Sequence, residues 1–137
     1  NLMDRRAELE VLPAARAFEL GVFPYFPLNN GLLTGKYRPD GGPRGSRLSY
    51  VRQHMVTNAD WEQLNRYSAF AAERDMTEVE VAFNWLAAQH PVASVIAGAT
   101  RIEQVQQNAQ ALEHTLSADD LAVLDEIFPP VDKIALF

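Results

Sequence analysis

The stretch that decides the fold runs Val95-Ile96-Ala97-Gly98-Ala99-Thr100-Arg101-Ile102-Glu103-Gln104. The apolar run over residues 92–97 predicts a buried strand. Thr100 and Glu103 have the T-x-x-E spacing of a capping box, so a helix is expected to begin there. A strand that passes to a helix through a glycine directs free backbone N–H groups at one point, at the positive end of the helix dipole. The stretch therefore predicts either an ordinary βα turn or a phosphate site, to which Arg101 would add a fixed positive charge.

A second apolar run, residues 21–26, predicts the other strand. Pro24 cannot donate a hydrogen bond to a sheet, so the strand is placed at residues 22–23, with Tyr25 and Phe26 at its C-terminal end. The order helix, strand, helices, strand, helix predicts an α/β fold with a parallel sheet. Two strands are too few for a stable open sheet or a closed barrel. The sequence also begins without an initiator methionine. We therefore expect residues 1–137 to be a single incomplete domain, a piece of a longer chain.

Helical spacing and capping residues predict the remaining elements. One helix is expected from Leu12 to Leu20, with Pro13 in its first turn and Gly21 as its C-terminal cap. Others are expected over residues 60–74, capped by Thr57 or Asn58, then over 77–89, up to Leu112, and over 117–127. The helix over 77–89 begins with a Thr77–Glu80 capping box and is apolar over most of its circumference. It should therefore be buried on more than one side.

Composition excludes several classes of function. The net charge of -6 argues against nucleic acid or an anionic membrane surface as a partner. The chain has no cysteine, hence no disulfide and no thiolate site. No apolar run approaches the ~20 residues of a membrane span. The N-terminal residues are polar and charged, with no signal-peptide core behind them, which predicts a cytoplasmic protein.

The segment 27–49 is rich in Gly, Pro, Asn, Lys and Arg and predicts a long surface loop. Its cations are either solvated or part of a lid that closes on an anion: Lys36, Arg38, Arg44 and Arg47. The three histidines are isolated from one another, so a metal site is not expected. Hydrolase, Walker and Rossmann glycine motifs are absent from the sequence. Tyr25, at a strand end, either stacks on a flat ligand ring or fills the mouth of a barrel.

Three motifs in order along the chain resemble a known family. They are Asn1-Leu2-Met3-Asp4-Arg5-Arg6-Ala7-Glu8, Pro24-Tyr25-Phe26-Pro27-Leu28-x-x-Gly31-Leu32-Leu33-Thr34-Gly35-Lys36-Tyr37 and Gly98-Ala99-Thr100-Arg101-x-Glu103-Gln104-x-x-x-Asn108. Together they resemble the C-terminal portion of an aldo-keto reductase, in the bacterial subgroup close to potassium-channel β subunits. The resemblance implies a TIM barrel that binds NADP(H) and reduces a carbonyl substrate. The chain would form a partial (β/α)8 barrel: roughly the last two βα units plus the C-terminal helix.

The resemblance also implies residues for the nicotinamide and pyrophosphate of the cofactor. Tyr25 would stack on the nicotinamide ring. The loop that follows it would wrap the pyrophosphate, and its residues are Pro27, Leu28, Asn29 and Asn30. Lys36 and Arg47 would close over the phosphates. Phe26 stands where the family usually has serine, so one polar contact to the cofactor is expected to be lost.

A second set of residues would bind the adenosine end. By resemblance, Gly98, Thr100 and Arg101 hold the 2′-phosphate at a helix N-terminus. Gln104 and Asn108, one turn apart on the same helix face, would meet the adenine. Gln107 stands where related proteins often have glutamate, which would weaken a contact to the adenine amino group.

The family's proton-donating Tyr and its Asp, Lys and His partners lie on the first four strands, which this chain does not contain. No catalytic residue is therefore assigned, and we expect the isolated chain to be inactive. An alternative function, which is not that of an enzyme, is a non-catalytic nucleotide-binding or oligomerisation module. Such a module would associate with itself through the exposed edge of its sheet.

Overall fold

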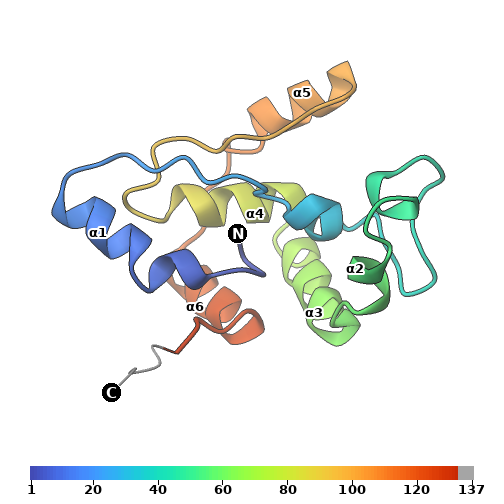
Figure 1. Ribbon diagram of the computed structural model, residues 1–137, viewed down its shortest axis with the longest axis horizontal. Coiled ribbons are helices and arrows are strands. Elements are labelled where there is room, and N and C mark those ends of the chain that lie inside the picture. Colours follow the sequence, from blue (N-terminus) through green and yellow to red (C-terminus); the bar gives the residue numbers. More distant parts are fainter. Residues whose placement is uncertain (133–137) are drawn as a thin grey trace.

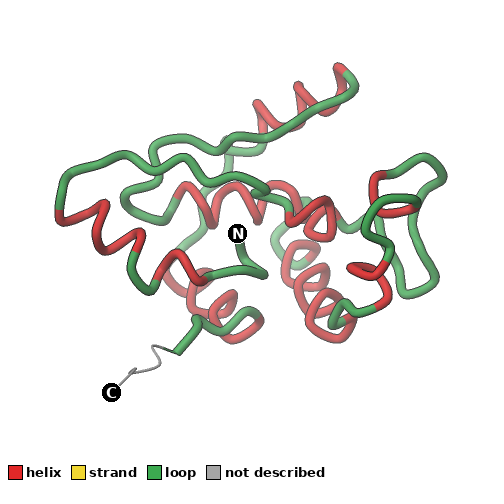
Figure 2. Tube along the Cα trace, in the orientation of Figure 1, coloured by secondary structure: helices red, strands yellow, loops and turns green. Residues whose placement is uncertain are grey.

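A computed structural model describes residues 1–132 of the chain (Figure 1). The elements in chain order are the 3₁₀ helix η1 (Arg6–Glu8), α1 (Val11–Ala17), η2 (Asn29–Thr34), η3 (Arg47–Ser49), α2 (His54–Thr57), α3 (Trp61–Ala72), α4 (Glu78–Ala87), α5 (Ile102–Gln110) and α6 (Ala118–Ile127). Within the described residues the chain consists of helices and loops (Figure 2). None of the helices there is long and apolar enough to cross a membrane.

The core lies between α3, α4 and α6. Six consecutive residues of α4, from Val81 to Leu86, are buried, so the helix is covered on more than one side, as predicted. The ring of Tyr67, on α3, meets the ring of Phe128 edge-on, with centroids 5.5 Å apart. Such edge-to-face pairs add a fraction of a kcal/mol to about 1.5 kcal/mol beyond their buried area. Figure 1 accordingly shows α4 in the middle of the molecule.

Two helix starts are as predicted. The Thr77 hydroxyl accepts a hydrogen bond from Glu80 N while the Glu80 carboxylate accepts one from Thr77 N, which is a complete capping box at α4. Ser117 and Asp120 make the same reciprocal pair at α6. Each box satisfies two N–H groups that the first helical turn leaves without partners.

Other helix ends differ from the prediction. Asp60, rather than Thr57 or Asn58, caps α3, and its carboxylate accepts a hydrogen bond from Gln63 N. Helix α1 ends at Ala17, because Glu19 turns the chain with a φ of 54° before Gly21 is reached. At α5 the predicted Thr100–Glu103 box is wrong, since Arg101 is the N-cap residue and makes no side-chain capping bond.

The two predicted strands are not formed as strands in the described residues. They meet at one isolated parallel bridge, Val22 with Val92. Val22 N donates to Pro91 O at 3.0 Å, and Ala93 N donates to Val22 O at 2.9 Å. The parallel direction is therefore as predicted, but the segment 92–97 is partly exposed rather than buried. Pro24 has no N–H to extend the ladder, and among residues 1–132 no third segment pairs with these two, so pairing stops after one bridge. The expected exposed sheet edge is accordingly absent from the described residues.

The segment 27–49 is a surface segment with a small core of its own. Leu32, Tyr37 and Leu48 are buried together with Val56 of α2. The Tyr37 hydroxyl oxygen accepts a hydrogen bond from Leu48 N at 3.1 Å. The predicted long surface loop therefore contains buried apolar residues that pack against one another and against α2.

Candidate functional site

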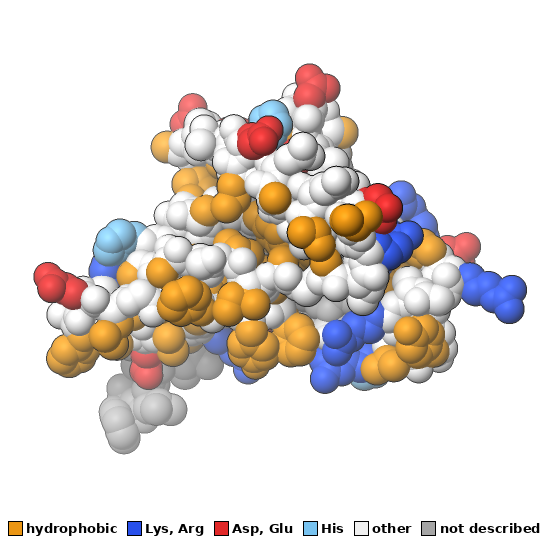
Figure 3. All heavy atoms as spheres, turned by 90° about the horizontal axis from the view of Figure 1, so that it is seen from above, with side chains coloured by type: hydrophobic (Ala, Val, Ile, Leu, Met, Phe, Trp, Pro, Cys, Tyr) orange, Lys and Arg blue, Asp and Glu red, His pale blue; other side chains and the backbone are white. Residues whose placement is uncertain are grey.

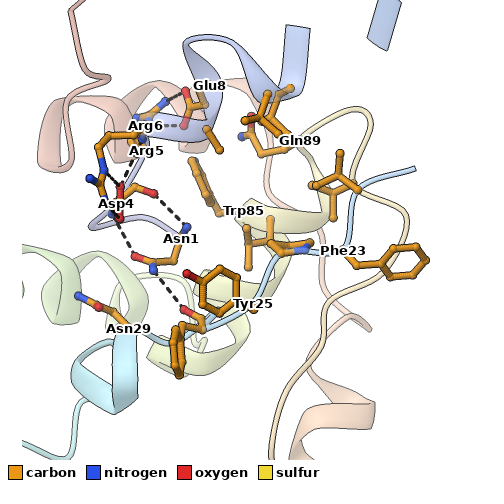
Figure 4. A pocket seen from close by; sticks show the side chains of 18 of the residues that line it. Asn1, Asp4, Arg5, Arg6, Glu8, Phe23, Tyr25, Asn29, Trp85 and Gln89 are labelled. Carbon is orange, nitrogen blue, oxygen red and sulfur yellow. Dashed lines mark hydrogen bonds and ion pairs between the residues drawn. The ribbon is translucent and has the colours of Figure 1, made fainter. Parts of the chain in front are cut away.

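The N-terminal segment, α1, residues 22–30 and α4 surround a pocket of about 790 Å³. Figure 4 shows this pocket, with Trp85 of α4 and Tyr25 among the side chains that line it. The ring of Phe23 points away from the pocket in that view, and the ring of Tyr25 points toward the N-terminal segment. Four of the predicted cofactor-binding residues line the pocket: Tyr25, Phe26, Asn29 and Asn30.

Tyr25 and Phe26 present an aromatic surface at the pocket. The Tyr25 side chain is 76% exposed. Its ring lies 4.8 Å from the ring of Phe26, centroid to centroid, at an interplanar angle of 49°. An exposed aromatic ring that borders a pocket is available to stack on a flat ligand. The Tyr25 ring lies exposed at the edge of the pocket rather than inside an enclosed space, and its stacking on a ligand stays a prediction.

The turn after Tyr25 has an unusual backbone. Phe26, Asn29 and Asn30 have φ values of 55°, 44° and 58°. Left-handed conformations are uncommon for residues with a side chain, and a bulky residue such as phenylalanine adopts them at a cost of about 1–3 kcal/mol. The turn is held by hydrogen bonds to the N-terminal segment, from Asn1 Nδ2 to Phe26 O and from Asn29 Nδ2 to Met3 Sδ. Strained backbone held in place in this way is common at ligand-binding turns.

The other residues of the predicted pyrophosphate loop differ in exposure. Pro27 is buried and Leu28 packs against the main core, so both anchor the turn to the body of the protein. Lys36 is exposed, with its Nζ 5.3 Å from the ring centroid of Tyr37. Arg47 is also exposed, and its guanidinium carbon lies 5.7 Å from the ring centroid of Phe26. Arg47 therefore approaches the pocket wall, whereas Lys36 is held beside the small core of the loop.

The predicted residues of the adenosine end lie elsewhere. Gly98, Thr100 and Arg101 are exposed, and a Cβ placed on Gly98 would meet no atom within 4 Å. Gln104 Oε1 accepts hydrogen bonds from Thr100 N at 2.9 Å and from Thr100 Oγ1 at 3.2 Å. Gln104 thus performs the capping that was predicted for Glu103. Asn108 follows one turn later, half-buried.

Helix α5, which carries these residues, stands away from the body of the molecule (Figure 1). None of its residues is buried, and its apolar Ile102 and Val105 are exposed. The residues from Gly98 to Asn108 are not among those that line the pocket. The structure therefore brings together the predicted nicotinamide-end residues and separates them from the predicted 2′-phosphate residues.

The N-terminal wall of the pocket is charged. Arg6 donates to Asp4 from Nε at 2.8 Å and from Nη2 at 2.6 Å, and these bonds hold the pKa of Asp4 below its usual range. Arg5 is buried, which by itself lowers the pKa of its guanidinium, but hydrogen bonds to Glu8 and Asp125 raise it above its usual value. Burial lowers the pKa of the Asn1 amino group. Among the described residues, no three His, Asp or Glu side chains gather as metal ligands would.

Two polar residues that hold the turn at the pocket, Asn1 and Arg52, were not among the predicted site residues. Asn1 anchors the turn through Phe26 O, and Arg52 lines the pocket and donates from Nη1 to Asn30 Oδ1 at 3.2 Å. A signal for Arg52 is present in the sequence, because five of the twelve cations of this acidic chain lie between Lys36 and Arg52, with Asp40 as the only acidic residue among them. For Asn1, local sequence carries no such signal, since its partner lies 25 residues away.

Comparison with known proteins identifies the family. The model of the aldo/keto reductase family matches residues 1–128. The uncharacterized oxidoreductase YrpG of Bacillus subtilis is 35% identical over 131 residues, which are 94% of this chain and 38% of that protein. The NADH-specific methylglyoxal reductase of Escherichia coli is 32% identical over 136 residues, 97% of this chain and 41% of that protein.

A probable voltage-gated potassium channel subunit beta of Oryza sativa is 32% identical over 119 residues, 82% of this chain and 36% of that protein. The resemblance to the subgroup near such subunits is thus confirmed. The chain spans about two fifths of the length of the curated relatives it matches. With a family match over nearly all of its described residues, this chain belongs to the aldo/keto reductase family.

Proposed function

We propose that the chain is the cofactor-phosphate-binding part of an NADP(H)-dependent aldo-keto reductase. In this proposal residues 1–137 form the last two βα units of a TIM barrel and its C-terminal helix. The observation that supports it best is the exposed Tyr25 ring beside a left-handed turn and an arginine. An aromatic face next to backbone N–H groups and a cation suits a dinucleotide, which carries a flat ring close to its pyrophosphate.

The cofactor, when bound, supplies the hydride that reduces a carbonyl carbon. The chain's own residues would bind and orient it. Tyr25 would stack on the nicotinamide, Asn29 and Asn30 would offer amide groups to the pyrophosphate, and Arg47 would neutralise its charge. Lys36 would act with Arg47, while Pro27 and Leu28 would hold the turn in place.

Residues 98–108 would bind the adenosine end. Thr100 and Arg101 precede α5, where free N–H groups and the helix dipole favour a phosphate. Gln104 already holds the backbone of Thr100, so its part in this proposal is to fix the start of the helix. Asn108 would then be the residue that meets the adenine. The separation of α5 from the pocket is compatible with a cofactor bound in an extended form that reaches both.

The choice between NADPH and NADH tests this proposal. The Escherichia coli relative named above is NADH-specific by name, so the family match alone does not decide the question. We expect the purified chain to bind NADPH more tightly than NADH, measured by the fluorescence of the reduced nicotinamide. Arg101→Ala should remove this preference, because its guanidinium would contact only the 2′-phosphate. Arg66→Ala, which changes an exposed arginine on α3, is the matched control.

Equal affinity for the two nucleotides in the unchanged chain would refute the roles of Thr100 and Arg101. If the chain binds neither NADPH nor NADH, the proposed function is refuted altogether. The alternative, a non-catalytic nucleotide-binding module, differs in one measurement on the complete protein. Reduction of a generic aldehyde by NADPH, abolished by Tyr25→Ala, supports the reductase, and nucleotide binding without any turnover supports the module.

A further inference from the structure

Two arginines share one aromatic ring at the pocket. The guanidinium carbon of Arg47 lies 5.7 Å from the ring centroid of Phe26, and that of Arg52 lies 6.0 Å from it. The two residues come from opposite ends of the segment 47–52, which includes the 3₁₀ helix η3. The ring of Tyr25 is the next neighbour, 4.8 Å from Phe26. An aromatic face attracts a guanidinium, so Phe26 holds both cations beside the exposed Tyr25 ring.

No carboxylate neutralises this pair in the described residues. The ion pairs found there involve Arg5, Arg6, Arg74 and His114 with acidic partners, and neither Arg47 nor Arg52. The chain as a whole carries a net charge of -6, so acidic partners are abundant elsewhere. Two like charges held near each other without a counter-ion repel, and a bound anion relieves that repulsion. Figure 3 shows Lys and Arg side chains gathered at the end of the molecule that carries this segment.

Arg52 is also tied to the turn that lines the pocket. Its Nη1 donates to Asn30 Oδ1 at 3.2 Å, and its own φ is 58°. A guanidinium has five N–H donors in a planar fork, so this bond leaves most of them available. The hydrogen bond ties the fork to Asn30, a residue of the left-handed turn that lines the pocket. The arginine is thereby pre-organised for a ligand that binds at the turn.

We propose that Arg52 binds the pyrophosphate of the dinucleotide, together with Arg47. The inference rests on the proposed function and adds to it a residue and the phosphate it contacts. The phosphate is identified by position, because a pyrophosphate is separated from a stacked nicotinamide by a single ribose. The 2′-phosphate lies at the opposite end of the cofactor and belongs to Arg101. Bidentate contact between a guanidinium and phosphate oxygens is the chemistry that this placement favours.

The roles proposed for Arg52 and Arg101 lead to different predictions about the binding of NADPH and NADH. The pyrophosphate is common to NADPH and NADH, so Arg52→Ala should weaken the binding of both by the same factor, on the order of tenfold. Arg101→Ala should weaken only the binding of NADPH. Arg52→Lys keeps the charge and loses the fork, so it should restore part of the affinity for both nucleotides. Arg66→Ala serves again as the matched surface control.

The experiment measures dissociation constants of the two nucleotides for the purified chain and its variants by nicotinamide fluorescence. Thermal unfolding of each variant without ligand shows whether the fold is intact, and we expect no change for Arg52→Ala because its side chain is exposed. Unchanged affinities in Arg52→Ala, with binding by the unchanged chain intact, overturn the role of Arg52 and leave the proposed function standing. A loss confined to NADPH also overturns it, since that would place Arg52 at the 2′-phosphate. A chain that binds neither nucleotide overturns both proposals.

Discussion

The guanidinium of Arg5 lies over the indole ring of Trp85, with its carbon 5.2 Å from the ring centroid. Arg5 also donates to Glu8 from Nε at 2.6 Å, to Asp125 from Nη1 at 2.6 Å and to the carbonyl oxygen of Phe128 at 2.6 Å. One buried cation therefore joins the N-terminal segment to α4 and to α6. The same segment supplies Asn1, which anchors the turn at the pocket.

Replacing Arg5 should destabilise the whole fold. Arg5→Ala removes charged hydrogen bonds to two carboxylates and leaves Phe128 O without its donor, which we expect to cost about 3 kcal/mol of unfolding free energy. The cost stays moderate because Asp125, with its side chain 49% exposed, regains water. Urea unfolding followed by tryptophan fluorescence measures it. Arg6→Ala is the control, since Arg6 is exposed and pairs only with Asp4; an equal loss in both variants would contradict the argument.

Asn84 should control how firmly α5 is attached. Its Nδ2 donates to Glu80 O at 2.8 Å within α4 and to Ala111 O at 2.6 Å, just after α5. Asn84→Ala leaves a buried carbonyl without a donor, so we expect a loss of about 1–3 kcal/mol. Hydrogen exchange over residues 102–111 should accelerate more than exchange in α3. Asn65→Ala, an exposed asparagine on α3, should leave both quantities unchanged.

The Tyr37 hydroxyl should position the arginine-bearing segment. Tyr37→Phe keeps the buried ring and removes the acceptor of the Leu48 N–H, so we expect about 1–2 kcal/mol of destabilisation. Because Leu48 follows Arg47, the affinity for NADPH and for NADH should fall together. Thermal unfolding and nucleotide titration measure the two effects. Tyr50→Phe, at an exposed tyrosine of the same segment, is the control, and a similar fall there would contradict this role.

Acid should weaken the start of α6 through Asp120. A hydrogen bond from Arg74 Nε at 2.5 Å, and further bonds from Ser117, hold the pKa of Asp120 below its ordinary value of 3.8. A carboxyl with a lowered pKa in the folded state contributes stability above its unfolded pKa and loses it as the pH falls. The unfolding free energy should therefore decline below about pH 4.

Asp120→Asn should reduce stability at pH 7 and flatten this decline between pH 5 and the acid limit of the folded state. Urea unfolding at a series of pH values measures the slope. Asp119→Asn is the control, because it removes one negative charge from the same helical turn at an exposed position. Its effect on the helix dipole is therefore comparable, and the slope of unfolding free energy against pH should be preserved. An unchanged slope in Asp120→Asn would show that another carboxylate is responsible.

How far the fold could be predicted depended on how local each interaction is. The capping box at Thr77 and the helix start at Ser117 were predicted correctly because each depends on groups within three residues. The box at Thr100 was not, because Gln104 offers the same backbone N–H an alternative partner one residue further on. The prediction of two strands was wrong because strand pairing depends on segments far apart in the sequence. The two predicted strands pair at a single bridge, between Val22 and Val92.

In the candidate site, too, some residues could be predicted from the sequence and others depend on tertiary contacts. The resemblance led to Tyr25, Asn29 and Asn30, which the structure places around one pocket. It did not lead to Arg52, whose relation to Phe26 arises only when the segment 47–52 folds back over the turn. The assigned ligand contacts of all these residues remain predictions that nucleotide titration tests.

The sequence by itself determined the family, the helices with local caps, and the concentration of positive charge between Lys36 and Arg52. Tertiary structure alone decided that Arg5 would reach Asp125, 120 residues away, and that two arginines would share the ring of Phe26. The physical reason is range: capping and periodicity act within a few residues, whereas buried ion pairs and strand pairing require the whole chain to be folded.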